Sequence, residues 1–82
     1  KKIRLTKERW SHIRRDHPNV EEEEIRHTIL KPLKIIDDGK NKFFYFQYFK
    51  HRKSPERYLR VVVKYLNGDG FIITAHPIRQ IR

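Results

Sequence analysis

Hydrophobic and polar positions alternate most regularly over residues 58–78, which predicts two β-strands joined by a turn. In the first strand, the odd-numbered positions 59–65 form one apolar face and the even-numbered positions point the other way. A loop of two or four residues would put Thr74 and His76 on the valine-rich face. We therefore expect a three-residue loop, Gly68-Asp69-Gly70, with its last glycine in the left-handed region.

This register predicts which polar side chains meet across the hairpin. It pairs Lys64 with Thr74 and Val62 with His76, so that Arg60 and Lys64 each lie one diagonal step from His76. One face of the hairpin then belongs to the core, and the other gathers the polar groups. We expect the nearby cations to lower the pKa of His76 and favour its neutral form.

Two stretches with helical spacing precede the strands. Thr6 is a suitable N-cap for a helix over residues 7–16, and Pro18 ends it. Asn19, followed by four glutamates, predicts the start of a second helix, which stops before Pro32. The glutamates suit the positive end of the helix dipole, so we assign them no catalytic role.

Residues 34–38 and 42–50 predict two further strands, joined by short turns to their neighbours. The second is apolar on both faces, as in the centre of a sheet. The expected fold class is α+β, with two N-terminal helices packed on one face of a four-stranded antiparallel sheet. Residues 1–82 are short enough to form a single domain.

The charge balance favours a phosphate-rich partner. Lys and Arg total 20 against 10 acids, which gives a net charge of +10. A solvated surface or an acidic protein partner are the alternatives. The absence of cysteine excludes disulfides and thiolate zinc sites. No apolar run approaches a membrane span and no secretory signal is visible, so we expect a cytoplasmic location, no membrane contact and no cofactor.

The polar face of the hairpin has the groups that RNA cleavage needs. RNA carries its own nucleophile, the 2′-hydroxyl, so a nuclease must supply a base, an acid and cations for the phosphate. Arg60, Lys64, Thr74 and His76 meet much of that requirement. The alternative is that they are the solvated side of a half-buried sheet. Other residues suited to RNA contact are Arg14, Arg15, Tyr48, Arg52, Lys53, Arg57, Tyr58 and Arg79.

Several motifs, in this order, resemble the phage and toxin branch of the barnase–EndoU–colicin–RelE (BECR) group of nuclease folds. They are Trp10-x-His12-Ile13, His17-Pro18 with the glutamates after it, Tyr58-Leu59-x-Val61-Val62-Val63-Lys64, and Gly70-Phe71-Ile72-Ile73-Thr74-Ala75. The resemblance implies two helices on a four-stranded antiparallel sheet. A tyrosine would commonly follow the Thr-Ala pair in such sequences, whereas this chain has His76.

The resemblance also implies a function. Better-known members of the group are metal-independent endoribonucleases, often toxins that act on tRNA or translated mRNA. It adds His12 and His17 to the catalytic candidates Arg60, Lys64, Thr74 and His76. As metal ligands the two helical histidines are poorly spaced, so we expect no metal site. A non-catalytic RNA-binding module, or the partner-binding domain of a toxin–antitoxin pair with an acidic antitoxin or immunity protein, is the alternative.

Overall fold

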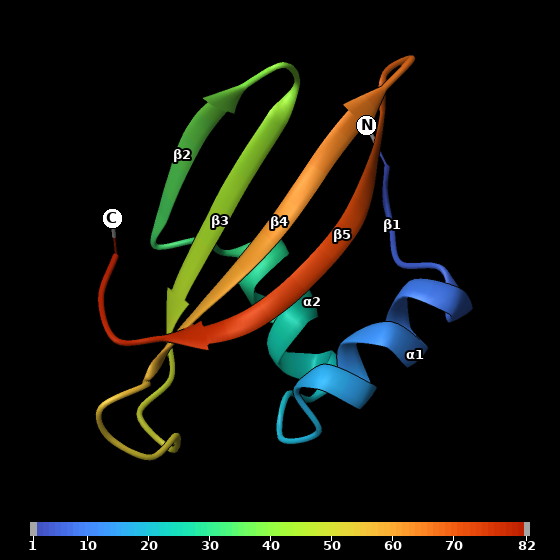
Figure 1. The fold of residues 1–82 in the computed structure, drawn as a ribbon. Helices are drawn as coiled ribbons and strands as arrows, with labels where there is room; N and C mark the ends of the chain where they lie inside the picture. The colour runs from blue at the N-terminus through green and yellow to red at the C-terminus, as the bar shows by residue number, and fades with distance from the viewer. Residues whose placement is uncertain (1, 82) are drawn as a thin grey trace.

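The computed structural model describes residues 2–81, which form two helices and a five-stranded sheet (Figure 1). The strands lie in the order β1-β5-β4-β3-β2; strands β2 to β5 pair antiparallel, and β1 pairs parallel with β5. The α+β class is confirmed, and the four expected strands pair antiparallel, but the sheet also contains β1 as a parallel edge strand that was not expected. In chain order the elements are β1 (Ile3–Arg4), α1 (Lys7–Asp16), α2 (Glu22–Leu30), β2 (Lys34–Gly39), β3 (Lys42–Tyr48), β4 (Tyr58–Leu66) and β5 (Asp69–Ile78).

The two helices begin with different caps. As predicted, Thr6 caps α1, and its hydroxyl accepts a hydrogen bond from the amide of Arg9 at 3.2 Å. The N-cap of α2 is Glu21 and not Asn19 as predicted. The carboxylate of Glu24 reaches back and accepts from the Glu21 amide at 2.9 Å, which satisfies a donor that helical bonding leaves open.

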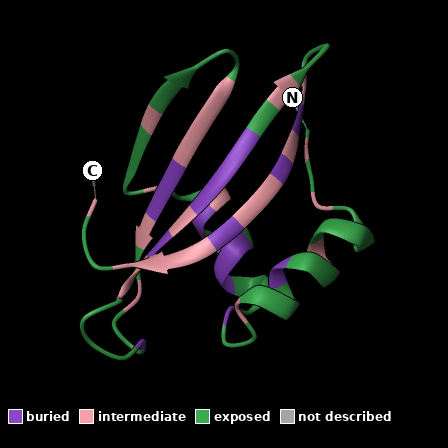
Figure 2. Cartoon of the chain, viewed as in Figure 1, coloured by how far each residue is buried: buried purple, intermediate pink, exposed green. Residues whose placement is uncertain are grey.

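Both helices pack on one face of the sheet, α1 against β5 and α2 against β3 and β4 (Figure 1). Ile13 of α1 and Ile25 of α2 are almost fully buried there. Figure 2 shows the buried residues running along β3, β4 and β5 and over the facing parts of the helices. The sheet contributes Tyr45, Leu59, Val61, Val63, Ile72 and Ala75 to this core.

The turn between β4 and β5 differs from the expected three-residue loop. Asn67 and Gly68 form a two-residue turn, both with positive φ (53° and 86°), and Leu66 pairs with Asp69. Asn-Gly is the sequence that such tight hairpin turns prefer. A β-bulge then leaves Ile73 without a direct partner in β4. This extra residue shifts the register by one, so that Thr74 and His76 lie on the same face as Val62 and Arg60.

The bulge changes the pairing and keeps the predicted face. Arg60 pairs with His76, Val62 with Thr74, and Lys64 with Phe71, so the predicted pairs Lys64–Thr74 and Val62–His76 are wrong. Directly paired residues share a face, so Arg60, Lys64, Thr74 and His76 still lie together, opposite the helices. We call this side of the sheet the open face.

Gly70 lies within β5 and is not the left-handed residue of the turn. A Cβ at this position would lie 2.9 Å from the ring of Tyr65 and 3.0 Å from Ile3. Glycine is therefore required because β1 and β4 both approach β5 closely at this point.

Candidate active site

Arg60, His76 and His17 come together from three separate parts of the chain. Arg60 in β4 lies directly opposite His76 in β5, because the bulge fixes that pairing. His17 is the C-cap residue directly after α1, and its backbone amide donates to the carbonyl of Ile13 at 2.7 Å. The packing of α1 against β5 brings the His17 ring to that of His76.

The contacts define the tautomer of His76 and the position of the His17 ring. The Nε of Arg60 donates to the Nε2 of His76 at 3.1 Å, and a terminal nitrogen of the same guanidinium lies 2.5 Å from that Nε2. The Nε2 of His76 is therefore the unprotonated nitrogen and carries the lone pair. The His17 and His76 rings are stacked, with centroids 5.8 Å apart and planes inclined by 28°.

These surroundings lower the pKa of His76. Burial is the largest cause, because it disfavours the charged ring, and the positive charge of Arg60 and the neighbouring His17 act in the same direction. The predicted lowering is thus confirmed, with Arg60 as the adjacent cation. A neutral imidazole at neutral pH is the form that can accept a proton.

Phe44 fixes the position of Arg60. The guanidinium carbon of Arg60 lies 4.9 Å from the centre of the Phe44 ring, a cation–π contact. Phe44 in turn makes an edge-to-face contact with Phe46, which is fully buried. Sequence reasoning missed this role, although the aromatic residues on both faces of residues 42–50 were the signal that could have indicated it.

The remaining catalytic candidates lie further out. Thr74 is half-buried on the open face, two residues from His76 along β5. Lys64 is exposed and lies four residues from Arg60 along β4, a separation of about 13 Å. His12 is half-exposed on α1, and its Nε2 lies 3.2 Å from a carboxylate oxygen of Asp16. The structure brings neither Lys64 nor His12 into the cluster of Arg60, His76 and His17.

Seven of the eight predicted RNA-contacting residues are at least partly exposed. Arg14 lies 5.8 Å from the centre of the Trp10 ring and, with Arg15, borders a shallow hollow on α1. Tyr48 and Tyr58 make an edge-to-face contact at 5.3 Å where β3 and β4 meet the loop between them. Arg57 donates to the Tyr48 hydroxyl at 3.4 Å, and Lys53 and Arg79 are exposed.

Arg52 is not available to RNA, so that prediction is wrong. Only 8% of Arg52 is exposed, and its guanidinium donates to both carboxylate oxygens of Glu24 at 2.7 Å. His51 lies 2.8 Å from the same carboxylate. Burial alone would raise the pKa of Glu24, but hydrogen bonds from the Glu21 amide, Arg52 and His51 outweigh it and lower that pKa. Arg52 therefore anchors the loop between β3 and β4 to α2.

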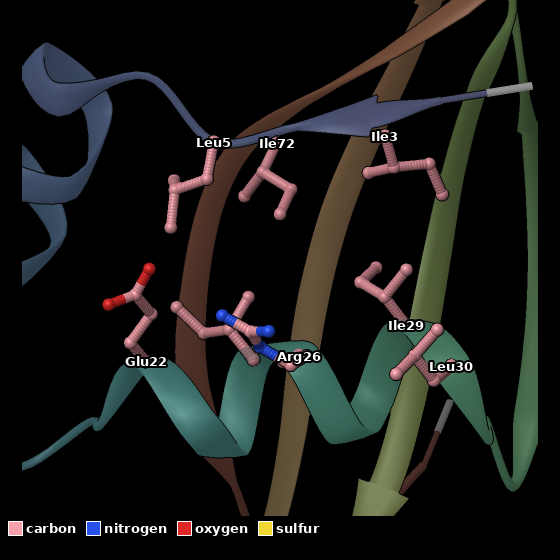
Figure 3. Close-up of a pocket in the computed structure, with 8 residues that line it drawn as sticks. Ile3, Leu5, Glu22, Arg26, Ile29, Leu30 and Ile72 are labelled. Atoms are coloured by element: carbon pink, nitrogen blue, oxygen red, sulfur yellow. The ribbon is translucent and has the colours of Figure 1, made fainter.

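An apolar groove of about 380 Å³ lies between β1 and α2. In Figure 3, side chains of Ile3, Leu5 and Ile72 point toward α2, while Ile29 and Leu30 point back from the helix. Glu22 and Arg26 are the charged residues at its border. The groove is on the side of the sheet that the helices cover, and it contains none of the catalytic candidates.

Two absences hold for the part of the chain that the structure describes. Within residues 2–81, no three His, Asp or Glu side chains are grouped so that they could hold a metal ion. Over the same residues, neither helix has the length and apolar character needed to cross a membrane.

Comparisons with protein-family models, with curated proteins and with solved structures find no match to this chain. Function is therefore inferred from the geometry of Arg60, His17 and His76 and from the surface around them.

Proposed function

We propose that the protein is a metal-independent endoribonuclease with Arg60, His17 and His76 as its catalytic residues. One observation carries the proposal: Arg60 and His76 pair on the open face, and the His17 ring from the end of α1 stacks on His76, so that two imidazoles and a guanidinium from three distant segments come together. The lowered pKa of His76 suits a general base, and a stacked second histidine can serve as the acid. The net charge of +10 favours a polyanionic substrate.

The reaction that these groups support is transfer of the phosphate to the neighbouring 2′-oxygen. Nε2 of His76 takes the proton of the 2′-hydroxyl, and the oxygen attacks the adjacent phosphorus. The bond between phosphorus and the 5′-oxygen breaks, and protonated His17 gives its proton to that oxygen. Arg60 neutralises the charge that builds up on the phosphate. The products are a 2′,3′-cyclic phosphate and a 5′-hydroxyl.

Arg60 also couples substrate binding to the base. In the protein alone, its guanidinium occupies the lone pair of His76. A bound phosphate competes for the same donors, because a charge-assisted bond to an anion is stronger than a bond to a neutral imidazole. Phosphate binding would therefore release the lone pair of His76 where it is needed.

The proposal is tested by RNA cleavage in the presence of excess chelator. Purified protein is incubated with total RNA, and the products are separated on a denaturing gel. We expect His76→Ala and His17→Ala each to lower the rate about 10²- to 10⁴-fold, the usual contribution of a general acid or base. His27→Ala is the matched control, since His27 is an exposed histidine on α2. Cleavage that is equal in all four proteins would refute the assignment.

A non-catalytic RNA-binding module is the second candidate. The observation that favours it is the Arg60–His76 hydrogen bond, which blocks the base in the protein alone. In that case the protein would bind RNA with the same surface and leave it intact. Stable binding over a long incubation, with no cyclic phosphate formed, distinguishes this function from the first.

An acidic antitoxin or immunity protein is a further proposed partner. Lys64 and Arg4 present positive charge on the open face, whereas Glu21–Glu23 lie at the start of α2, on the other side of the sheet. A negatively charged protein would dock on the open face and cover His76. Co-expression with the product of a neighbouring reading frame tests this, and failure to form a complex or relieve toxicity would exclude it.

A further inference from the structure

The open face is organised in rows of residues that pair across neighbouring strands. The first row contains Lys34, Phe46, Arg60 and His76, and the second contains Ile36, Phe44, Val62 and Thr74. The third row runs across four strands and contains Lys42, Lys64, Phe71 and Arg4. Three of its four members are cations, and the fourth is an aromatic ring.

The third row is accessible to a ligand. Arg4 and Lys64 are exposed, and Lys42 and Phe71 are partly exposed. Lys42 is paired with Asp38 at 3.2 Å, whereas Arg4 and Lys64 have no acidic partner within residues 2–81. Asp69 follows on the same face, two pairs closer to the turn. Arg4 and Lys64 are thus the cations of this row that an anion can reach without breaking an ion pair.

We propose that Arg4, Lys64 and Phe71 form a distal subsite for single-stranded RNA, separate from the catalytic cluster. Arg4 and Lys64 would each bind one phosphate, and the Phe71 ring between them would stack with the base between these phosphates. This inference rests on the proposed function, because it takes the Arg60–His76 row as the place where the strand is cut.

The separation of the rows defines the length of RNA that is needed. The catalytic and distal rows are four residues apart on β4, which is about 13 Å. A strand stacked as in a duplex advances about 3.4 Å per nucleotide, so about four nucleotides would span the gap, and fewer if the strand is extended. The row between them contains no charged residue. Its Phe44 ring already contacts the cations of Arg60 at 4.9 Å and Lys42 at 5.8 Å, and the Thr74 hydroxyl suits a sugar better than a phosphate.

This placement gives Lys64 a different role from the catalytic one expected from the sequence. Since it is too far from His76 to contact the same phosphate, it cannot stabilise charge at the bond that is cut. It binds the strand away from that bond, and its loss weakens binding of long strands only.

The test uses fluorescence anisotropy with 2′-O-methyl oligouridylates of two and eight nucleotides, which lack the nucleophile and stay intact. We expect Lys64→Gln and Arg4→Gln each to weaken binding of the eight-nucleotide strand about tenfold. Each should also reduce the slope of log affinity against log salt by about 0.7, the value for one phosphate contact. Neither variant should change binding of the two-nucleotide strand. Lys31→Gln is the matched control, because Lys31 is an exposed lysine just after α2. It should change neither the affinity for the eight-nucleotide strand nor the salt slope.

Two outcomes would overturn the subsite. One is an equal loss of affinity for the eight-nucleotide strand in Lys64→Gln and Lys31→Gln. That result would show that binding depends on the overall positive charge and not on a defined contact with Lys64. The other is wild-type affinity that does not increase from two to eight nucleotides. Failure of the proposed nuclease activity would look different: the length-dependent binding would remain, and an all-RNA strand of the same length would stay uncut.

Discussion

At the scale of single residues, the state of His76 depends on Arg60. The guanidinium donates to the Nε2 of His76, and its charge disfavours a second proton on the ring. The alternation of the sequence correctly predicted that both residues share a face. The predicted register was incorrect, however, and put Arg60 and Lys64 each one diagonal step from His76. The direct pairing of Arg60 with His76 could not be predicted, because it depends on one unpaired residue in β5.

Replacing Arg60 should change the titration of His76. In Arg60→Gln the positive charge is gone, so we expect the pKa of His76 to rise toward its ordinary value near 6.5 while remaining below it, because burial still acts. Proton-coupled shifts of the imidazole resonances in NMR spectra measure this, with His27 as the internal reference. An unchanged His76 titration would show that Arg60 does not control the protonation of His76.

The lowered pKa of His76 in the folded protein predicts how stability depends on pH. The folded protein resists protonation of His76, so the unfolded chain binds the proton first as the pH falls through about 6.5. The contribution of this group to the free energy of unfolding therefore decreases below that pH and is constant above it. Urea denaturation of wild type and His76→Gln between pH 7.5 and 5 checks the sign: the variant should lose less stability on acidification.

At the scale of elements, the loop between β3 and β4 is held by a buried ion pair. We expect Arg52→Ala to lower the free energy of unfolding by about 3 kcal/mol, because the carboxylate of Glu24 would stay buried with only the His51 ring and the Glu21 amide as partners. Lys53→Ala, one residue further and exposed, should change it by less than about 0.5 kcal/mol. Chemical denaturation measures both. Equal stability of the two variants would mean that Arg52 is a surface residue, as the sequence suggested.

The packing of β1 on β5 makes a second prediction at this scale. Gly70→Ala should lower the free energy of unfolding by about 1–3 kcal/mol, since its Cβ would press on the Tyr65 ring and on Ile3. Thermal unfolding measures this. A variant as stable as wild type would show that β1 moves aside easily and is not a fixed part of the sheet.

The same elements show what sequence patterns can predict. Both helices, the four main strands and the polar face of β4 and β5 follow from spacing and alternation alone. The two-residue strand β1 is too short to show a pattern, and its parallel pairing is a long-range contact. The bulge at Ile73 and the burial of Arg52 were missed because each depends on what another segment brings to it.

At the scale of the whole molecule, the charge distribution predicts salt-dependent binding. Affinity for an uncleavable 2′-O-methyl strand should fall with salt, with a slope of log affinity against log salt of about −0.7 for each phosphate contact. With about five to eight contacts, the total slope would be about −4 to −6. Anisotropy titrations between low and physiological salt measure it. A flat dependence would contradict electrostatic binding of nucleic acid by this +10 surface.

The central claim is that Arg60, His17 and His76 cut RNA by attack of the 2′-hydroxyl. The most direct measurement uses a DNA strand with a single ribonucleotide, incubated with the protein in excess chelator and resolved by mass spectrometry. We predict one cut, directly after the ribonucleotide, with a 2′,3′-cyclic phosphate on one fragment and a 5′-hydroxyl on the other, and no cut with His76→Ala. Cleavage of the all-deoxy strand, or equal cleavage by His76→Ala, would contradict the account.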